Sequence, residues 1–238
     1  MQSSDIAMTA TPRLKAVVFD AFGTLFDVYS VGLLAEQLFP GKGEALAALW
    51  RQKQIEYSQL RTLAGRHRPF WELTRDALDF AARKLGLAMS EAAGTQLLNQ
   101  YSCLSPFPEN AAALRELKAL GVPTAILSNG TPQMLEVSVR SAGLAGLFDH
   151  VLSVEKVERY KPHPDAYAMG PAALGCEARE ILFVSANGWD AAGATWFGYT
   201  TFWINRNGQP AEALDVSPHG SGDSLGDVVE FIRRRRPG

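Results

Sequence analysis

The sequence lacks the features that mark several large classes of protein. Only two of its 238 residues are cysteines, Cys103 and Cys176, and they lie too far apart in the chain to suggest a disulfide framework. No stretch approaches the ~18 consecutive apolar residues that a membrane-spanning helix needs. A formal net charge of -2 gives no electrostatic signature for nucleic acid or for an anionic membrane. We therefore expect an ordinary soluble globular protein with neither of these partners.

The two ends of the chain carry little functional signal. Residues 1–13 are mostly small and polar, without the basic segment and apolar block of a signal peptide, and predict a loose leader. The basic run Arg233 to Arg236 follows the last predicted helix, where solvated cations complement the helix dipole. We therefore expect a cytoplasmic protein.

What is present is a pattern of alternating strands and helices. With 47% hydrophobic residues the chain can form one sizeable core and a second, smaller one. Strands are predicted for residues 15–19, 122–127, 150–154, 181–184 and 199–204, the last of which closes the sheet, and helices for residues 109–120, after 131–132, from 165 onward and for 225–233. This alternation predicts an α/β fold with a doubly wound parallel, Rossmann-like sheet.

A long helical stretch interrupts this pattern after the first strand. Apolar residues recur at helical spacing from Leu33 to Leu85, with breaks at Pro40-Gly41 and at residues 67–69. We therefore predict an inserted helical cap domain over residues 27–107 and a catalytic core made of residues 14–26 and 108–238. Within the cap, Arg51 follows Trp50 on a mostly apolar helix, where an unpaired guanidinium would be costly to bury. A side chain that simply extends to water fits the sequence equally well.

Polar side chains gather where the predicted strands end. The carboxyl ends of parallel strands form one edge of the sheet, which is where α/β proteins bind ligands. Each polar group alone would be an ordinary turn or helix cap. Their convergence instead predicts an active site, with the first aspartate as candidate nucleophile. The residues concerned are Asp20, Thr24, Ser128, Asn129, Lys161, Ser185, Asn187 and Asp190.

These segments resemble a known family. Asp20-Ala-Phe-Gly-Thr24-Leu, Ser128-Asn-Gly130, Lys161-Pro162 and the aspartate-bearing fourth loop resemble the four motifs of the haloacid dehalogenase superfamily. Residues 19–27, 49–54, 126–130 and 185–190 are similar to the (S)-2-haloacid dehalogenases in particular, and residues 49–54 belong to a cap motif that relatives with other chemistry lack.

The sequence departs from the phosphatase branch of that superfamily at two positions. Those phosphatases carry an aspartate two residues after the nucleophile and another in the fourth loop that holds magnesium, whereas this chain has Phe22 and Ala186. Neither side chain offers the oxygen ligands that magnesium requires. We therefore expect no metal and no cofactor.

The resemblance implies a first chemical step at carbon. Asp20 attacks C2 of a short 2-haloalkanoate, and the halide leaves from the opposite face toward Arg51 and Asn129. Thr24 and Lys161 keep the nucleophile ionised and aimed. Ser128, with backbone donors near Ala21 and Phe22, holds the substrate carboxylate. The remaining substrate-binding residues that we predict are Gln52, Ile55, Phe70 and Trp189.

The second implied step hydrolyses the Asp20 ester. Asp190, oriented by Ser185 and Asn187 and close to Lys161, is the predicted general base. Tyr167 falls on a position where the family has a functional tyrosine, and a buried structural tyrosine fits equally well. Attack from the back inverts C2, so an L-2-haloacid yields a D-2-hydroxyacid.

Two other functions remain open from the sequence. One is a phosphomonoesterase with unusual metal use, which Phe22 and Ala186 disfavour. The other is a binding protein without catalysis on the same fold, which the presence of nucleophile, halide site and base disfavours. The resemblance also implies a homodimer.

Overall fold

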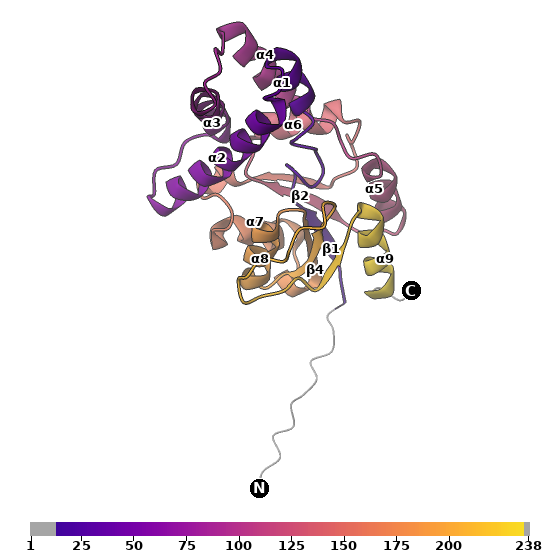
Figure 1. The fold of residues 1–238 in the computed structure, drawn as a ribbon. Helices are drawn as coiled ribbons and strands as arrows, with labels where there is room; N and C mark the ends of the chain where they lie inside the picture. Colours follow the sequence, from indigo (N-terminus) through magenta and orange to yellow (C-terminus); the bar gives the residue numbers. More distant parts are fainter. Residues whose placement is uncertain (1–12, 236–238) are drawn as a thin grey trace.

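Six parallel strands form the centre of this computed structural model, which describes residues 13–235 (Figure 1). Their order across the sheet is β3-β2-β1-β4-β5-β6. The strands are β1 (Ala16–Phe19), β2 (Thr124–Ser128), β3 (His150–Ser153), β4 (Ile181–Ser185), β5 (Thr200–Ile204) and β6 (Gly220–Gly222). Residues 1–12 of the predicted leader and Arg236 of the basic run lie outside the described residues. The predicted parallel α/β architecture is confirmed.

The central strands are buried on both faces. Every residue of β1, β2 and β4 is buried, and Val17 pairs with Thr124 on one side and Leu182 on the other. Strands covered on both faces read as continuous apolar runs, because no side of the strand needs to face water. This is why the run before Asp20 predicted a strand so clearly.

Helices cover both faces of the sheet. Figure 1 shows α7 and α8 on one side and α5 and α9 on the other. The helices are α5 (Asn110–Ala119), α6 (Pro132–Ser141), α7 (Pro164–Leu174), α8 (Gly188–Phe197) and α9 (Leu225–Arg235), with short 3₁₀ helices η1 (Val154–Val157) and η2 (Ala178–Glu180). None of the helices between residues 13 and 235 has both the length and the apolar character needed to span a membrane.

The prediction that residues 199–204 close the sheet was wrong. Strand β6 pairs with β5 in parallel, Phe202 with Gly220 and Ile204 with Gly222. The Gly-Ser-Gly segment carries none of the β-branched or aromatic residues by which strands are recognised. Glycine is required there by packing, because a Cβ at Gly220 would lie 2.6 Å from a ring carbon of Phe231.

Of the five helices between β1 and β2 in the chain, the first four lie above the sheet edge formed by the carboxyl ends of the strands (Figure 1). They are α1 (Gly32–Leu38), α2 (Gly43–Leu63), α3 (Phe70–Lys84) and α4 (Glu91–Ser102). Trp50 in α2 is buried and donates its indole N–H to the Thr74 carbonyl in α3 at 2.7 Å. The Asp27 amide donates to the Ser105 carbonyl at 2.8 Å, so the outgoing and returning segments lie side by side. This agrees with the cap that we expected, whose limits at residues 27 and 107 stay a prediction.

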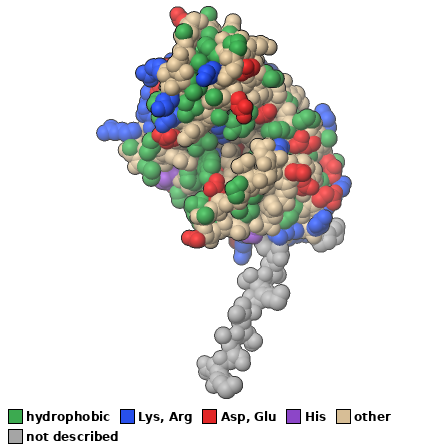
Figure 2. Space-filling view, viewed as in Figure 1, with side chains coloured by type: hydrophobic (Ala, Val, Ile, Leu, Met, Phe, Trp, Pro, Cys, Tyr) green, Lys and Arg blue, Asp and Glu red, His purple; other side chains and the backbone are tan. Residues whose placement is uncertain are grey.

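The surface is mixed in character. On the face in Figure 2, basic, acidic and apolar side chains are interspersed, and no wide area carries one sign of charge. This distribution fits the net charge of -2.

Candidate active site

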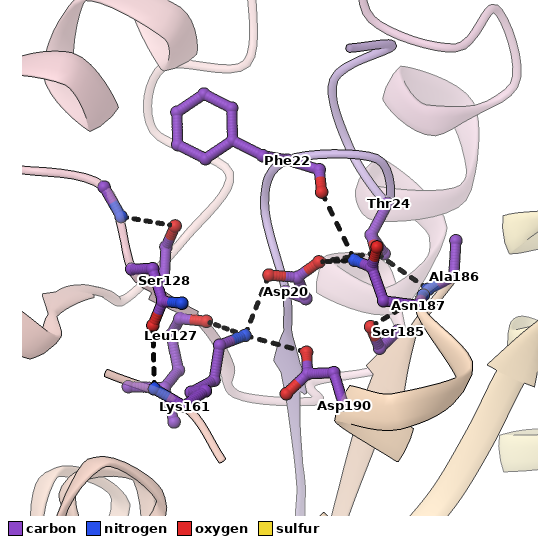
Figure 3. A network of polar contacts seen from close by, with 12 residues as sticks. Asp20, Phe22, Thr24, Leu127, Ser128, Lys161, Ser185, Ala186, Asn187 and Asp190 are labelled. Atoms are coloured by element: carbon purple, nitrogen blue, oxygen red, sulfur yellow. Dashed lines mark hydrogen bonds and ion pairs between the residues drawn. The ribbon is translucent and has the colours of Figure 1, made fainter. Parts of the chain in front are cut away.

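Asp20 lies directly after β1, at the sheet edge that faces the helical cap (Figure 3). Asp20 is 5% exposed, and its carboxylate accepts three hydrogen bonds. Lys161 Nζ donates to Oδ1 at 2.8 Å, and Thr24 Oγ1 and Asn187 Nδ2 each donate to Oδ2 at 2.9 Å. The carboxylate is thus held in one orientation by donors from three separate segments, and it keeps one face toward the cavity described below.

Lys161 bridges the two aspartates of the site. Its ammonium is 1% exposed and lies 2.8 Å from Asp20 Oδ1, 2.8 Å from Asp190 Oδ2 and 3.1 Å from the Leu127 carbonyl oxygen. These contacts use all three of its donors. Burial lowers the pKa of Lys161, but the charges of Asp190 and Asp20 outweigh it, so the pKa is raised and the lysine stays charged.

Asp190 is completely buried in the first turn of α8. Tyr167 Oη donates to its Oδ1 at 2.7 Å, while Lys161 holds Oδ2. Burial raises the pKa of Asp190, and the charge of Asp20 adds to the rise against the opposing effect of Lys161. Tyr167 is therefore in direct contact with the predicted base, and burial raises its own pKa well above the usual value.

The contacts of Ser185 and Asn187 differ from the prediction. We expected both residues to orient Asp190, but the Asn187 amide donates instead to Asp20, and Ser185 Oγ accepts from the Asn187 backbone N–H at 3.1 Å. Thr24 Oγ1 likewise accepts from the Ala186 backbone N–H at 2.8 Å while donating to Asp20. The loop of residues 185–187 is therefore hydrogen-bonded to Asp20 and Thr24. Asn187 lies just before α8, which carries Asp190, and its side chain points toward Asp20 rather than toward Asp190.

Arg51 reaches down from α2 into the same site. Its Nη1 donates to Gln54 Oε1 at 2.8 Å, and its Nη2 donates to the Phe22 carbonyl at 2.9 Å and to Asn187 Oδ1 at 3.4 Å. Although it is only 8% exposed, it forms no ion pair with any carboxylate of residues 13–235. A buried cation whose partners are all neutral favours an anion beside it.

A small cavity lies between Asp20 and Arg51. Its free volume is about 10 Å³, close to the ~10–15 Å³ that one water needs. Its walls mix the polar groups already named with apolar side chains from the cap and from α8. The lining residues are Asp20, Phe22, Arg51, Ile55, Ser58, Phe70, Ser128, Asn129, Lys161, Asn187 and Trp189. A ligand larger than a water can enter only if side chains or the cap move.

Two backbone donors directly follow Asp20, and of their residues Phe22 lines this cavity whereas the predicted Ala21 does not. Within residues 13–235, no acceptor lies in hydrogen-bond range of the N–H groups of Ala21 and Phe22, although both residues are buried. Buried backbone donors are rarely left without a partner, so this pair suits a bound anion. Ser128 is also buried there, and its hydroxyl accepts from the Gly130 N–H at 3.1 Å.

A second, larger cavity of about 730 Å³ adjoins the first. The two share Arg51, Ile55 and Asn187 as lining residues. These three side chains therefore lie where the small cavity and the larger one meet.

One predicted substrate-binding residue, Gln52, does not reach the site. Its side chain is exposed and lines neither cavity. A helix turns by about 100° per residue, so Gln52 points away from Arg51, whereas Ile55 and Gln54 lie within about 60° of it. The sequence reasoning missed Gln54, which helical spacing from Arg51 would have found.

The carboxylates at this edge are Asp20 and Asp190, and the Lys161 ammonium lies between them. Within the described part of the chain, no group of three or more His, Cys, Asp or Glu side chains is placed to hold one. The Phe22 ring packs against Phe70 and Tyr101 with centroid distances of 6.2 and 6.0 Å, and it makes one wall of the cavity apolar.

Comparisons with known proteins agree on one family. The family of haloacid dehalogenase-like hydrolases matches residues 14–198. The (S)-2-haloacid dehalogenase of Pseudomonas sp. strain YL is 47% identical over 219 residues, which are 92% of this chain and 94% of that protein.

Two solved structures extend the likeness to three dimensions. L-2-haloacid dehalogenase RSc1362 has a TM-score of 0.91 and 57% identity, covering 92% of this chain and 99% of that one. The L-2-haloacid dehalogenase of Xanthobacter autotrophicus, with chloropropionic acid covalently bound, has a TM-score of 0.87 and 40% identity, covering 92% and 98%. The similarity therefore extends well beyond the residues at the strand ends.

Proposed function

Because this chain belongs to the haloacid dehalogenase-like hydrolase family, we propose that it hydrolyses short L-2-haloalkanoic acids to D-2-hydroxyalkanoic acids and halide. The observation that carries this proposal is the geometry of the small cavity. A carboxylate held by Lys161, Thr24 and Asn187 lies on one side, and the uncompensated cation Arg51 lies on the other. The relative with chloropropionic acid covalently bound supports a covalent route.

In the first step, an Asp20 carboxylate oxygen attacks C2 of the substrate from the side opposite the halogen. The C–O bond forms as the carbon–halogen bond breaks, and its electron pair leaves with the halide. Arg51, aided by Asn129, stabilises the charge that develops on the halide. Ser128 and the N–H groups of Ala21 and Phe22 bind the substrate carboxylate, which would otherwise repel Asp20.

The apolar part of the cavity assists this displacement. Phe22, Phe70, Ile55 and Trp189 leave little room for water around the nucleophile. A carboxylate that has lost part of its hydration is more reactive, provided that other groups keep it ionised. Lys161, whose Nζ lies 2.8 Å from Asp20 Oδ1, keeps the Asp20 carboxylate ionised.

In the second step, a water attacks the side-chain carbonyl carbon of the Asp20 ester. Asp190 accepts one proton of that water, and the acyl C–O bond breaks as the leaving alkoxide takes up the other, which releases the hydroxyacid. The proton on Asp190 then passes to solvent. Tyr167 and Lys161 hold the Asp190 carboxylate, and their hydrogen bonds favour its ionised form against the effect of burial. The hydroxyl oxygen of the product comes from Asp20, and the oxygen of water enters the carboxylate.

A metal-dependent phosphatase is the less favoured function. The places where such enzymes carry two further aspartates are occupied by Phe22 and Ala186, which provide no oxygen ligand from their side chains. We therefore propose that catalysis is independent of metal and cofactor. We also propose the cytoplasmic location and the homodimer that the family resemblance implies, and size-exclusion chromatography would test the dimer.

The deciding experiment measures halide release from the two enantiomers of 2-chloropropionate in the presence of EDTA, beside p-nitrophenyl phosphate with magnesium. We expect chloride from the (S) enantiomer alone, at a rate that EDTA does not change. Asp20→Asn serves as the control and should release none. Phosphate release without chloride would instead support a phosphatase.

The ester intermediate has a separate test. In a single turnover in heavy-oxygen water, the label should enter the Asp20 carboxylate and be absent from the first product. Label found directly in that product would refute the covalent step while leaving the dehalogenase activity intact.

A further inference from the structure

Gln54 contacts Arg51 within the cap and lines neither of the two cavities. It is 0% exposed, and its Oε1 accepts from Arg51 Nη1 at 2.8 Å and from Tyr101 Oη at 2.9 Å. Its Nε2 donates to Thr74 Oγ1 at 2.7 Å. Both ends of the buried amide are therefore satisfied.

The orientation of this amide is fixed by Thr74. The Thr74 hydroxyl has a single hydrogen, which it donates to the Phe70 carbonyl at 2.8 Å. Its oxygen can then only accept from Gln54, so the NH₂ end must face Thr74. The carbonyl end is left facing Arg51, because the reverse orientation would set two donors against each other at Arg51 and two acceptors against each other at Thr74.

The same network fixes the position of the guanidinium within the cap. Gln54 is on α2, Thr74 on α3 and Tyr101 on α4, so three cap helices meet at one amide. Tyr101 also stacks on Phe22, and burial raises its pKa, which keeps its hydroxyl protonated as a donor to Gln54.

We propose that Gln54 is a positioning residue for the leaving halide: it aims the Arg51 guanidinium at the cavity while leaving its charge uncompensated. This inference rests on the proposed function. Three hydrogen bonds use three of the five guanidinium donors, which leaves two for a halide. A glutamate in the same place would hold Arg51 equally well but would neutralise the field that the halide needs, because a carboxylate carries a full negative charge.

The test compares rates of halide release in single turnovers of 2-chloropropionate and 2-bromopropionate. Misplacing a catalytic group by about 1 Å can cost about 10²-fold in rate, so we expect Gln54→Leu to lose between about tenfold and about hundredfold with the chloride. Chloride is the poorer leaving group and depends more on Arg51, so the bromide-to-chloride rate ratio should rise. General loosening of the cap would slow both substrates alike and leave this ratio unchanged.

A double-mutant cycle shows whether Gln54 acts through Arg51. Adding Gln54→Leu to Arg51→Ala should change the rate by less than about twofold, since the group being positioned is already gone. Gln59→Leu, the same substitution on a half-buried position of α2, is the matched control and should leave the ratio at the wild-type value. Gln54→Glu keeps the shape of the side chain and should also raise the bromide-to-chloride rate ratio. This variant tests the positioning role if Gln54→Leu does not fold.

The outcomes separate the two proposals. Suppose that the wild type releases halide but the bromide-to-chloride rate ratio is unchanged in Gln54→Leu and Gln54→Glu. This result would overturn the positioning role alone, and so would rate effects of Gln54→Leu and Arg51→Ala that are fully additive. No halide release by the wild type from either substrate would overturn the proposed function, and the role of Gln54 would fall with it.

Discussion

Replacing Lys161 with methionine tests the electrostatic centre of the site. The substitution keeps most of the buried volume but removes the cation that lies 2.8 Å from both Asp20 and Asp190. Two buried carboxylates would then face each other without compensation. Removing one partner of a buried ion pair ordinarily costs about 3–5 kcal/mol of stability.

The folded protein can limit that cost by binding a proton. Asp190, whose pKa burial already raises, is the carboxyl expected to take it up. Holding a proton on an aspartate with an ordinary pKa of about 3.9 costs about 1.36 kcal/mol per pH unit, which is about 4.2 kcal/mol at pH 7 and about 1.5 kcal/mol at pH 5. The stability lost by Lys161→Met should therefore shrink by about 2.7 kcal/mol between pH 7 and pH 5.

The sign follows from proton linkage. The folded variant keeps a proton that the unfolded chain releases above about pH 4, so its stability falls as the pH rises through this window. In the wild type, the raised pKa of Lys161 changes stability only at high pH. The stabilisation that Lys161 contributes is complete below the usual lysine pKa and is lost as the pH rises through the raised pKa of the folded protein.

Urea denaturation at pH 5, 6 and 7, followed by tryptophan fluorescence and far-ultraviolet circular dichroism, measures this difference. Lys15→Met is the matched control, because its ammonium lies 2.7 Å from Glu180 but its side chain is 55% exposed, and it should change stability little. The denaturant slope should be the same for all variants if only stability changes. A stability loss for Lys161→Met of equal size at pH 5 and pH 7 would refute the proton uptake.

Two further predictions concern a tyrosine of the site and a pair of helical glycines. Tyr167→Phe removes the 2.7 Å hydrogen bond to Asp190 and should raise the pKa of that base further. The acid limb of the pH–rate profile for ester hydrolysis should therefore move to higher pH. An acid limb at the wild-type pH would argue against Asp190 as the base. Gly170→Ala should destabilise the protein by about 1–3 kcal/mol in thermal or urea unfolding, because the new Cβ would overlap Tyr199 Oη. Gly94→Ala, whose Cβ would meet nothing closer than 3.8 Å, should instead stabilise helix α4 by about 0.5–1 kcal/mol, and equal effects at the two glycines would contradict the packing argument.

Much of the fold could be predicted because its signals are local. The run before Asp20 is apolar and β-branched because β1 is buried on both faces, and Thr131-Pro132 starts α6 with a hydroxyl that accepts from the Met134 N–H. Each such signal lies within a few neighbouring residues. Strand β6 escaped prediction because nothing in Gly-Ser-Gly itself favours a strand, and its pairing with β5 and its fit beside Phe231 exist only in the folded chain.

The sequence by itself determined which residue types meet at the sheet edge. Strand direction alone carries Asp20, Ser128, Lys161 and Asp190 to one edge, since parallel strands all end on the same side. The departure at Phe22 from the metal-binding pattern of the phosphatases is likewise visible in the sequence alone.

Only the tertiary structure decided which of these groups touch. It assigned the Asn187 amide to Asp20 rather than to Asp190, put Gln54 instead of Gln52 beside Arg51, and left Arg51 buried among neutral acceptors. The physical reason is that such contacts join segments far apart in the chain, 136 residues in the case of Arg51 and Asn187. Side-chain packing, hydrogen-bond satisfaction and the rotation of one helix set them, and none of these can be inferred from neighbouring residues.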